Sequence, residues 1–368
     1  MARRPFLHPL HQFLGAVFHE YRDWELPERY QDPTQEHRVV RERVGLIDLA
    51  HRTLMRVTGK DRTRYLNGML TNDIKAHAEG EGCYACLLSP QGKVLADLEV
   101  YTLSDAYLID LEATWKERAL DHLNKYLIAD DVTLQEMDGV LSLFALQGPE
   151  AGGVLQRLVG PLPLPPEPYR HLEARYEGVA CRVICSDLTG ERGFKLIVPQ
   201  EKAEALWQAM IEASASPVGM AAFNTLRIEA GIPWYGVDFD EGNFPQEADI
   251  EERAISFTKG CYIGQEFVIR IAHRGHVNRR VSGFTLEGED LPAGGDRIVK
   301  DGKEVGRITS VTFSPALGKI VALGMLRREC WEPGTSVEVE RGGRLLPAVV
   351  VPLPFYHRQP SATPNVSR

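Results

Sequence analysis

The pattern of hydrophobic and polar residues divides the chain into two regions. Before residue 280, strand-like runs alternate with segments in which apolar residues recur every three or four positions, as on one face of a helix. After Arg280, short β-like segments alternate with Gly and Pro turns, and helical periodicity is nearly absent. The first region is therefore predicted to be α+β, and the second to be a separate antiparallel barrel or sandwich.

Helix signals are clearest at four places. Asp32-Pro33-Thr34-Gln35 is typical of an N-cap followed by a proline at the first helical position, and it predicts a helix that ends before Gly45. Thr114-Trp115-Lys116-Glu117 has the spacing of a capping box and predicts a helix that starts there. Two more helices are expected over 201–213 and 218–230. Between the first two signals, strands alternate with helices, which suggests a small ferredoxin-like unit.

Length and charge narrow the classes of protein. Single cores stop growing at roughly 250–300 residues, so 368 residues predict two or three domains. The net charge of −9 makes nucleic acid an unexpected general partner. Six scattered cysteines are too few for a disulfide scaffold, and we find neither a signal peptide nor a membrane span. We expect a cytoplasmic, reduced protein.

One segment combines a thiol, a lysine and two glycines. Lys259 to Glu266 reads Lys-Gly-Cys-Tyr-Ile-Gly-Gln-Glu, and a run with helical spacing follows from Phe267. Cys261 would then lie just before a helix start, where the helix dipole favours an anion and can lower the pKa of a thiol. Cys261 is therefore a candidate reactive residue. The alternative is a cysteine that merely fits a tight loop.

Glu229 breaks a local rule of helix electrostatics. It lies in the last turn of an expected helix, directly before the Gly231 stop, where a carboxylate opposes the dipole at a cost of roughly 0.3–1 kcal/mol. Such a residue is a candidate for function, because a carboxylate can accept two parallel N–H donors, and a pterin ring presents such a pair. The alternative is a Glu229 that is held by a nearby arginine such as Arg227.

Three other features carry candidate chemistry. On a strand, Asp97 shares one face with Glu99, where it could steer a cationic amine, although an exposed polar face is the more frequent case. Cys83-Tyr84-Ala85-Cys86 is a C-x-x-C that lacks two further ligands for zinc, so we predict no metal site. The basic segment 273–280, which includes Arg274, is either an anion contact or a solvated hinge.

These motifs together resemble the folate-binding superfamily of the glycine-cleavage T-protein, from about Arg41 to about Leu326. The resemblance is carried by 43–48, 57–61, 226–231 and 322–325. Lys259 to Glu266 is more specific, because it resembles the signature of the YgfZ branch, folate-dependent factors of iron–sulfur cluster assembly or repair that support tRNA thiolation enzymes. Gln265 replaces an arginine that assists folate binding in aminomethyltransferases, and only Asp97 remains of two consecutive aspartates at 96–97.

The resemblance implies a three-domain cloverleaf. A discontinuous central domain would comprise 1–52, 141–235 and 259–280, with a ferredoxin-like domain over 53–140 and 236–258. A C-terminal antiparallel β-barrel would span 281–358, followed by a disordered tail over 359–368.

Tetrahydrofolate, or a one-carbon derivative of it, would lie in the central channel. Cys261 and Asp97 are the candidate catalytic residues, and the candidates for binding tetrahydrofolate are Glu229, Lys259, Gln265 and Arg274.

Three functions stay open from the sequence, and whether the chain is an enzyme stays open with them. The first hypothesis is a factor of iron–sulfur cluster assembly or repair, with iron–sulfur enzymes or assembly proteins as partners. The second is an aminomethyltransferase of the glycine cleavage system, or another folate-dependent one-carbon transferase, in which Asp97 orients the amine. The third is a non-enzymatic protein that contacts an anion or RNA through 273–280.

Overall fold

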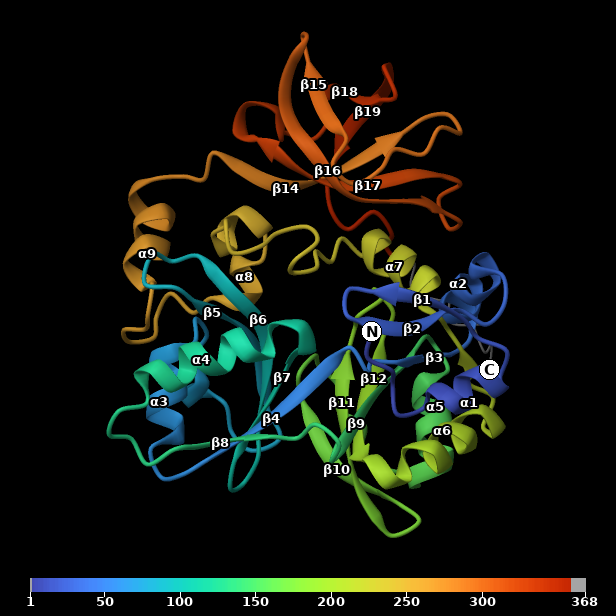
Figure 1. The fold of residues 1–368 in the computed structure, drawn as a ribbon, viewed down its shortest axis with the longest axis vertical. Coiled ribbons are helices and arrows are strands. Elements are labelled where there is room, and N and C mark those ends of the chain that lie inside the picture. The colour runs from blue at the N-terminus through green and yellow to red at the C-terminus, as the bar shows by residue number, and fades with distance from the viewer. Residues whose placement is uncertain (1, 359–368) are drawn as a thin grey trace, which may run out of the picture.

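The computed structural model describes residues 2–358, which form three lobes (Figure 1). Each lobe is built on its own sheet: one of six strands, one of five strands, and one that closes into a barrel. The predicted α+β class with a C-terminal antiparallel barrel is therefore confirmed. The residue boundaries of the three domains stay a prediction, and the tail predicted over 359–368 lies outside the described residues.

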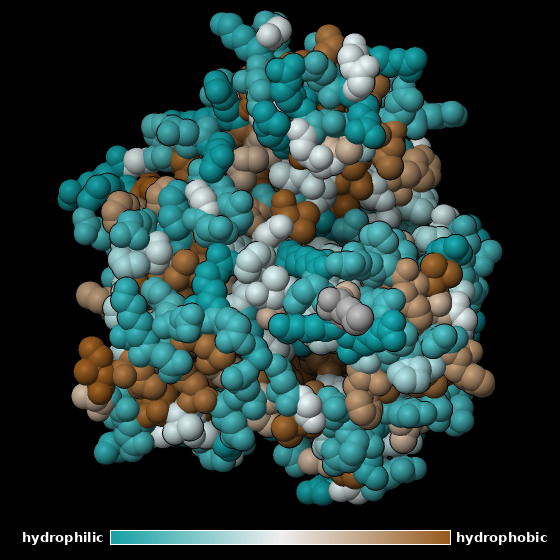
Figure 2. All heavy atoms as spheres, in the orientation of Figure 1, coloured by the Kyte–Doolittle hydropathy of each residue, from teal (hydrophilic) through white to brown (hydrophobic). Residues whose placement is uncertain are grey.

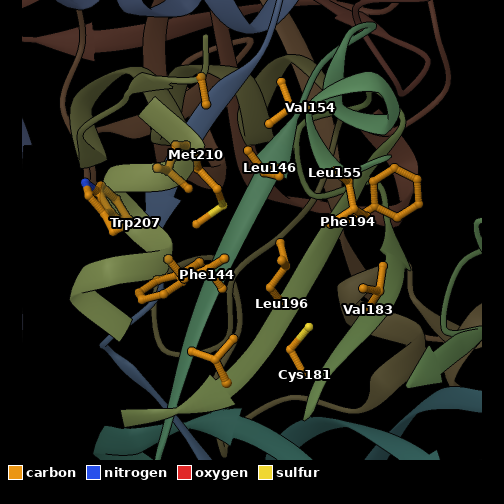
Figure 3. Close-up of a cluster of buried hydrophobic side chains, with 14 of the residues drawn as sticks. Phe144, Leu146, Val154, Leu155, Cys181, Val183, Phe194, Leu196, Trp207 and Met210 are labelled. Atoms are coloured by element: carbon orange, nitrogen blue, oxygen red, sulfur yellow. The ribbon is translucent and has the colours of Figure 1, made fainter. Parts of the chain in front are cut away.

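The six-stranded sheet has the strand order β10-β11-β12-β9-β3-β13. Its neighbouring strands are antiparallel except for β13 and β3, which run parallel. Helices α5 and α6 cover one face, where Phe144, Trp207 and Met210 pack together (Figure 3). The bounds are β3 Gly45–Asp48, β9 Leu141–Gln147, β10 His171–Tyr176, β11 Val179–Ser186, β12 Gly193–Pro199, β13 Ser216–Pro217, α5 Ala151–Val159 and α6 Ala203–Glu212. Helix α6 confirms the helix predicted over 201–213.

The five-stranded sheet is antiparallel, with the order β5-β6-β7-β4-β8. One face packs against helices α3 and α4. The other contributes Leu54, Tyr101 and Leu108 to a core shared with Ile184 and Ile197 of the six-stranded sheet. The bounds are β4 Arg52–Thr58, β5 Gly82–Leu88, β6 Val94–Thr102, β7 Tyr107–Glu112, β8 Thr133–Glu136, α3 Arg62–Met69 and α4 Lys116–Tyr126.

The N-terminal segment and two helices complete the lobe of the six-stranded sheet. The segment contains α1 (His8–Phe13) and the hairpin of β1 (Val17–Tyr21) and β2 (Trp24–Arg29). Helix α2 (Pro33–Glu42) begins as predicted, because the Asp32 carboxylate accepts hydrogen bonds from the Thr34 and Gln35 backbone N–H groups. Helix α7 (Met220–Glu229) confirms the helix predicted over 218–230.

The capping box predicted at Thr114 is wrong. A 3₁₀ turn occupies Ala113–Trp115, and α4 begins only at Lys116. The Thr114 hydroxyl donates a hydrogen bond to Asp23 Oδ1 at 2.8 Å instead of to the helix end. A tertiary contact with the N-terminal hairpin has replaced the local cap that the spacing indicates.

The barrel closes in the order β14-β17-β16-β15-β18-β19, with β19 paired back to β14. It rests on α7 through Arg227, whose guanidinium bonds Asp238 and the Ser310 hydroxyl. Two short helices, α8 (Glu251–Ala254) and α9 (Gln265–Arg274), lie in the connection that leads to it. The barrel bounds are β14 Arg279–Leu286, β15 Arg297–Lys300, β16 Lys303–Ser314, β17 Lys319–Arg327, β18 Ser336–Arg341 and β19 Arg344–Val351.

A buried charge network joins the six- and five-stranded sheets. Lys195 on β12 has no exposed surface, and its Nζ lies 2.7 Å from Glu99 Oε1 and 2.8 Å from Asp110 Oδ2. Arg52 on β4 also bonds Asp110, and Tyr101 donates to Glu99. A single ammonium group therefore links the two sheets through two carboxylates.

We predict that Lys195→Met strongly destabilises the protein. Removal of one partner from a buried ion pair costs about 3–5 kcal/mol, because the remaining charge stays buried without compensation. Differential scanning calorimetry should show a fall in Tm of many degrees. The matched variant Lys202→Met, at an exposed position, should leave Tm within about a degree of the wild type. Equal Tm values for the two variants would contradict this account of the network.

Candidate functional site

Asp97 lies on the face of β6 that also carries Tyr101, opposite the face that packs against α3 and α4. Tyr84 on the neighbouring strand β5 donates a hydrogen bond to Asp97 Oδ2 at 2.8 Å. Burial and the negative charge of Asp97 raise the pKa of Tyr84 far above its usual value, so its hydroxyl remains a donor. Glu99 shares this face, as predicted, and is engaged by Lys195.

Arg253 connects Asp97 with a recess in the surface. Its guanidinium lies 4.6 Å from the centre of the Tyr84 ring, in cation–π geometry. Burial on its own would lower the pKa of Arg253, but the nearby Tyr84, Tyr169, Asp97 and Asp187 raise it. Arg253 therefore stays positively charged, and its charge interacts with the Asp97 carboxylate.

The recess beside Arg253 has a volume of about 400 Å³. It forms where helix α7, the 249–253 segment and the chain leaving the barrel come together. Enclosure raises the pKa of Asp187 even though its side chain opens into the recess, and Arg253 partly offsets this effect. The lining residues are Asp187, Gly190, Ala230, Gly231, Ile232, Pro233, Asp249, Arg253, Pro354, Tyr356, His357 and Arg358. This mixture of carboxylates, guanidinium groups and an aromatic ring suits a polar ligand with a flat ring.

A second recess of about 370 Å³ lies beside the N-terminal segment. Its lining includes Arg3, Trp24, Arg52 and Met137. It reaches the charge network at Arg52, but within residues 2–358 none of its lining residues hydrogen-bonds Asp97 or stacks on the Tyr84 ring. We therefore place the candidate site in the recess that Arg253 shares.

Glu229 is fully buried at the end of α7, behind the recess. Its Oε2 accepts hydrogen bonds from His37 Nε2 at 2.7 Å and from Arg41 Nη2 at 2.6 Å, and its Oε1 accepts one from Ser314. Burial on its own would raise the pKa of Glu229, but the hydrogen bonds from His37, Arg41 and Ser314 hold it below the usual range. An arginine does hold this carboxylate, but it is Arg41 on α2, not the neighbouring Arg227.

Glu191 and Arg41 belong to the same cluster, and no local sequence pattern indicates either of them as a site residue. Glu191 has no exposed surface; its Oε1 lies 3.1 Å from Arg41 Nη1 and its Oε2 lies 2.8 Å from Arg358 Nη1. The Tyr356 ring covers Arg41, 3.9 Å from the guanidinium carbon. Arg358 is 40% exposed and lines the recess, whereas Glu191 does not, so the Arg358 side chain lies between Glu191 and the recess.

Lys259 serves the fold of its own lobe. Its Nζ donates to the carbonyl oxygens of Asn67, Leu70 and Asn72 at 2.6–2.7 Å, at and beyond the end of α3. Burial lowers the pKa of Lys259 to about 8, so the ammonium with its three donors is the form present at neutral pH. The ammonium caps the last turn of α3, where unpaired carbonyl groups and the dipole favour a cation.

The residues that follow Lys259 also lie away from the recess. Gly264 has a φ of +82°, and a Cβ there would meet the Ser89 carbonyl oxygen at 2.6 Å, so the loop needs glycine. Cys261 is exposed, and α9 begins four residues later, at Gln265. Gln265 and Arg274 mark the two ends of α9, and the recess lining includes no residue of this helix.

The basic segment 273–280 is partly neutralised by its own protein. Arg279 Nε lies 3.1 Å from Glu247, and Arg280 pairs with Asp249 at 3.7 Å and covers the Trp331 ring. The C-x-x-C cysteines are separated as well, because Cys83 packs against the helices of its lobe and Cys86 belongs to another cluster. No group of three metal-binding side chains occurs within residues 2–358.

The face drawn in Figure 2 is mostly hydrophilic, with hydrophobic side chains scattered between the polar ones. No helix within residues 2–358 is long and apolar enough to cross a membrane.

Comparison with known proteins defines the family. The model of the GCVT N-terminal domain matches residues 7–259, and that of the glycine cleavage T-protein C-terminal barrel domain matches 279–357. The chain belongs to the glycine cleavage T-protein family. An aminomethyltransferase of Rubrobacter xylanophilus is 34% identical over 97% of this chain and 95% of its own length. One of Chloroherpeton thalassium is 35% identical over 96% and 98%.

A solved structure supports the same assignment. The glycine cleavage system aminomethyltransferase T of Bartonella henselae superposes with a TM-score of 0.90. The match covers 97% of this chain and 98% of that chain, at 25% sequence identity.

These relatives correct the interpretation based on Lys259 to Glu266. The superfamily is confirmed, but the matched relatives are named aminomethyltransferases, so iron–sulfur enzymes or assembly proteins as partners are wrong. The contacts give a physical reason. Lys259 caps α3 and Gly264 fits a close turn, so the packing of the lobe accounts for the most specific residues of the motif.

We predict that Lys259 and Cys261 differ sharply in their effect on stability. Lys259→Met should lower the free energy of unfolding by about 1–3 kcal/mol, because buried carbonyl groups lose their donors. Cys261→Ser should leave Tm unchanged, because the side chain is exposed. Thermal unfolding measures both effects, and Lys75→Met, at an exposed position nearby, serves as the control. A Lys259→Met protein as stable as Lys75→Met would refute the capping role.

Proposed function

We propose that this chain is a tetrahydrofolate-dependent aminomethyltransferase that acts on a carrier-bound aminomethyl group and releases ammonia. The observation that carries the proposal is the position of Asp97. It lies on a central sheet face, linked through Tyr84 and Arg253 to a recess of about 400 Å³. Relatives that match this chain over nearly its whole length bear the name aminomethyltransferase.

Asp97 suits a reaction whose substrate is a cationic amine. A carboxylate on the wall of an enclosed site attracts and orients an ammonium or iminium group, and it can accept or return a proton. Tyr84 holds Asp97 Oδ2 in place, and Cys86, directly opposite on β5, stays a neutral thiol because burial and Asp97 raise its pKa. Asp97 is therefore the candidate catalytic residue, and Cys86 takes no part as a nucleophile.

The residues at the recess fit tetrahydrofolate. Its volume falls within the usual range of roughly 300–1,000 Å³ for ligand sites. Paired N–H donors of a pterin require a carboxylate, and Glu191 can supply one once Arg358 moves aside. Arg253 and Arg358 can meet the carboxylates of a glutamate tail. Tetrahydrofolate, when bound, accepts the one-carbon unit.

We propose that Glu229 does not contact the ligand directly but acts on it through Arg41 and Glu191. Its carboxylate fixes Arg41, and Arg41 in turn fixes Glu191, so Glu229 determines where the Glu191 carboxylate lies. A direct bond from Glu229 to a pterin would require the His37 and Arg41 bonds to open. Lys259, Gln265, Arg274 and Cys261 lie outside the recess, and we propose loop and helix roles for them.

Asp97→Asn should lower kcat for methylene-tetrahydrofolate formation by roughly 10²–10⁴-fold, the usual contribution of a positioned acid or base. The assay uses tetrahydrofolate and a lipoylated carrier protein charged with the aminomethyl group. Asp121→Asn, at an exposed position on α4, is the matched control and should retain full activity. Absence of turnover by the wild type would end the proposal.

Glu191→Gln and Glu229→Gln should differ in their effect on tetrahydrofolate binding. Glu191→Gln should weaken tetrahydrofolate binding by roughly 10–100-fold, because a charge-assisted hydrogen bond is lost. Glu229→Gln should mainly lower Tm, because it removes the buried charge that pairs with His37 and Arg41. Calorimetric titration and thermal unfolding measure the two effects. Loss of binding without a change in Tm for Glu229→Gln would instead identify Glu229 as the direct ligand.

A further inference from the structure

Two adjacent strands place four carboxyl groups on one face of the five-stranded sheet. Leu98 pairs with Leu111 and Glu99 with Asp110, so the next position along the ladder sets Asp97 beside Glu112. Residues two apart on a strand share a face, which puts Asp97, Glu99, Asp110 and Glu112 at the corners of one small square. Side chains that face each other across neighbouring strands have Cβ atoms about 4.5–5.5 Å apart.

The square has two rows, Glu99 with Asp110 and Asp97 with Glu112, and the negative charges of the two rows are neutralised to different extents. Glu99 and Asp110 share Lys195, and Asp110 also bonds Arg52. Asp97 accepts the Tyr84 hydroxyl, which carries no charge. Glu112 is 91% buried, yet its Oε1 has no hydrogen-bond partner and lies 3.4 Å from Arg22 Nη1. The Asp97 row therefore carries two carboxyl groups, and within residues 2–358 neither of them forms a hydrogen-bonded ion pair, although Arg22, Arg52 and Arg253 lie nearby.

We propose that Glu112 supplies the second carboxyl group of the site and serves as a proton store for Asp97. Strand β6 has alanine at position 96, and its side chain packs toward α3 and α4, so the carboxyl group that accompanies Asp97 comes from β7, where Glu112 lies at the level of Asp97. The exchange is balanced: protonated Glu112 and the Asp97 carboxylate become the Glu112 carboxylate and protonated Asp97. Glu112 is a positioning residue that acts through Asp97, and this role rests on the proposed transferase function.

The electrostatic surroundings of Glu112 support a proton held at neutral pH. Burial raises the pKa of Glu112 to about 7, Arg22 and Arg52 lower it, and Asp97 and Asp23 raise it. Tyr21 also faces this carboxyl, and its own pKa is raised in part by Glu112. Two carboxyl groups side by side disfavour a double negative charge, so one of them keeps a proton.

Carboxyl ¹³C NMR of the unliganded protein tests the proton store. The Glu112 signal, assigned by its loss in Glu112→Gln, should titrate near pH 7. The Asp97 signal, assigned with Asp97→Asn, should shift through the same step, and that shift should vanish in Glu112→Gln. Glu117→Gln, at an exposed position, should leave both signals unchanged. Absence of the shared step would overturn the proposal, whatever activity the protein has.

The pH dependence of activity and stability gives two further readouts. The limb of kcat/KM near pH 7 should disappear in Glu112→Gln and be restored in Glu112→Asp; an unchanged profile would overturn the store role.

The folded protein keeps a proton on Glu112 up to pH about 7, whereas an unfolded chain releases it near 4.5. Stability linked to this group is thus present below pH 4.5 and lost as pH rises through 7. Glu112→Gln should therefore gain Tm relative to the wild type between pH 5 and pH 8, and no relative gain would contradict the raised pKa.

Discussion

The buried ammonium group of Lys195 is the interaction on which the site depends. Two carboxylates of the five-stranded sheet approach one side chain of the six-stranded sheet, and all three groups are nearly or fully removed from water. Such an arrangement holds only if the charges stay close together, because each one alone would be costly to bury. The positions of Glu99 and Asp110 are thereby fixed, and Asp97 and Glu112, two residues away on the same strands, are carried to the seam between the lobes.

A second set of buried charges places the barrel. Arg227 and Glu229 are neighbours on α7, yet they have different partners: Arg227 bonds Asp238 and Ser310, and Glu229 bonds Arg41 and Ser314. Both sets of contacts reach strand β16 of the barrel. The chain then returns past Tyr356 and Arg358 to cover Arg41 and Glu191. The recess therefore exists because the barrel is docked, and its walls come from parts of the chain that are far apart in sequence.

Local patterns predicted much of the fold. The cap at Asp32, the helices over 201–213 and 218–230 and the strand-rich C-terminal barrel are encoded within a few residues, and the structure confirms them. The capping box at Thr114 failed because Asp23, 91 residues away, takes the hydroxyl. Local spacing cannot reveal such a partner.

The candidate site could be predicted only in part from the sequence, for the same reason. Asp97 and Glu229 stand out locally, one by its place on a strand and the other by its unfavourable helix position. The bonds of Glu191 to Arg41 and Arg358, and the approach of Arg253 to Tyr84, depend on tertiary contacts across 150 or more residues. Lys259 is the opposite case, because its motif indicated a role in binding a ligand. In the structure its ammonium group donates to three backbone carbonyl groups instead.

We expect the recess beside Arg253 to hold tetrahydrofolate with its reactive part toward Asp97. A crystal structure of the protein soaked with tetrahydrofolate under anaerobic conditions tests this most directly. We expect a pterin between Tyr356 and Arg253, with Arg358 displaced from Glu191. Tetrahydrofolate bound beside Cys261 and α9, with the recess unchanged, would contradict it.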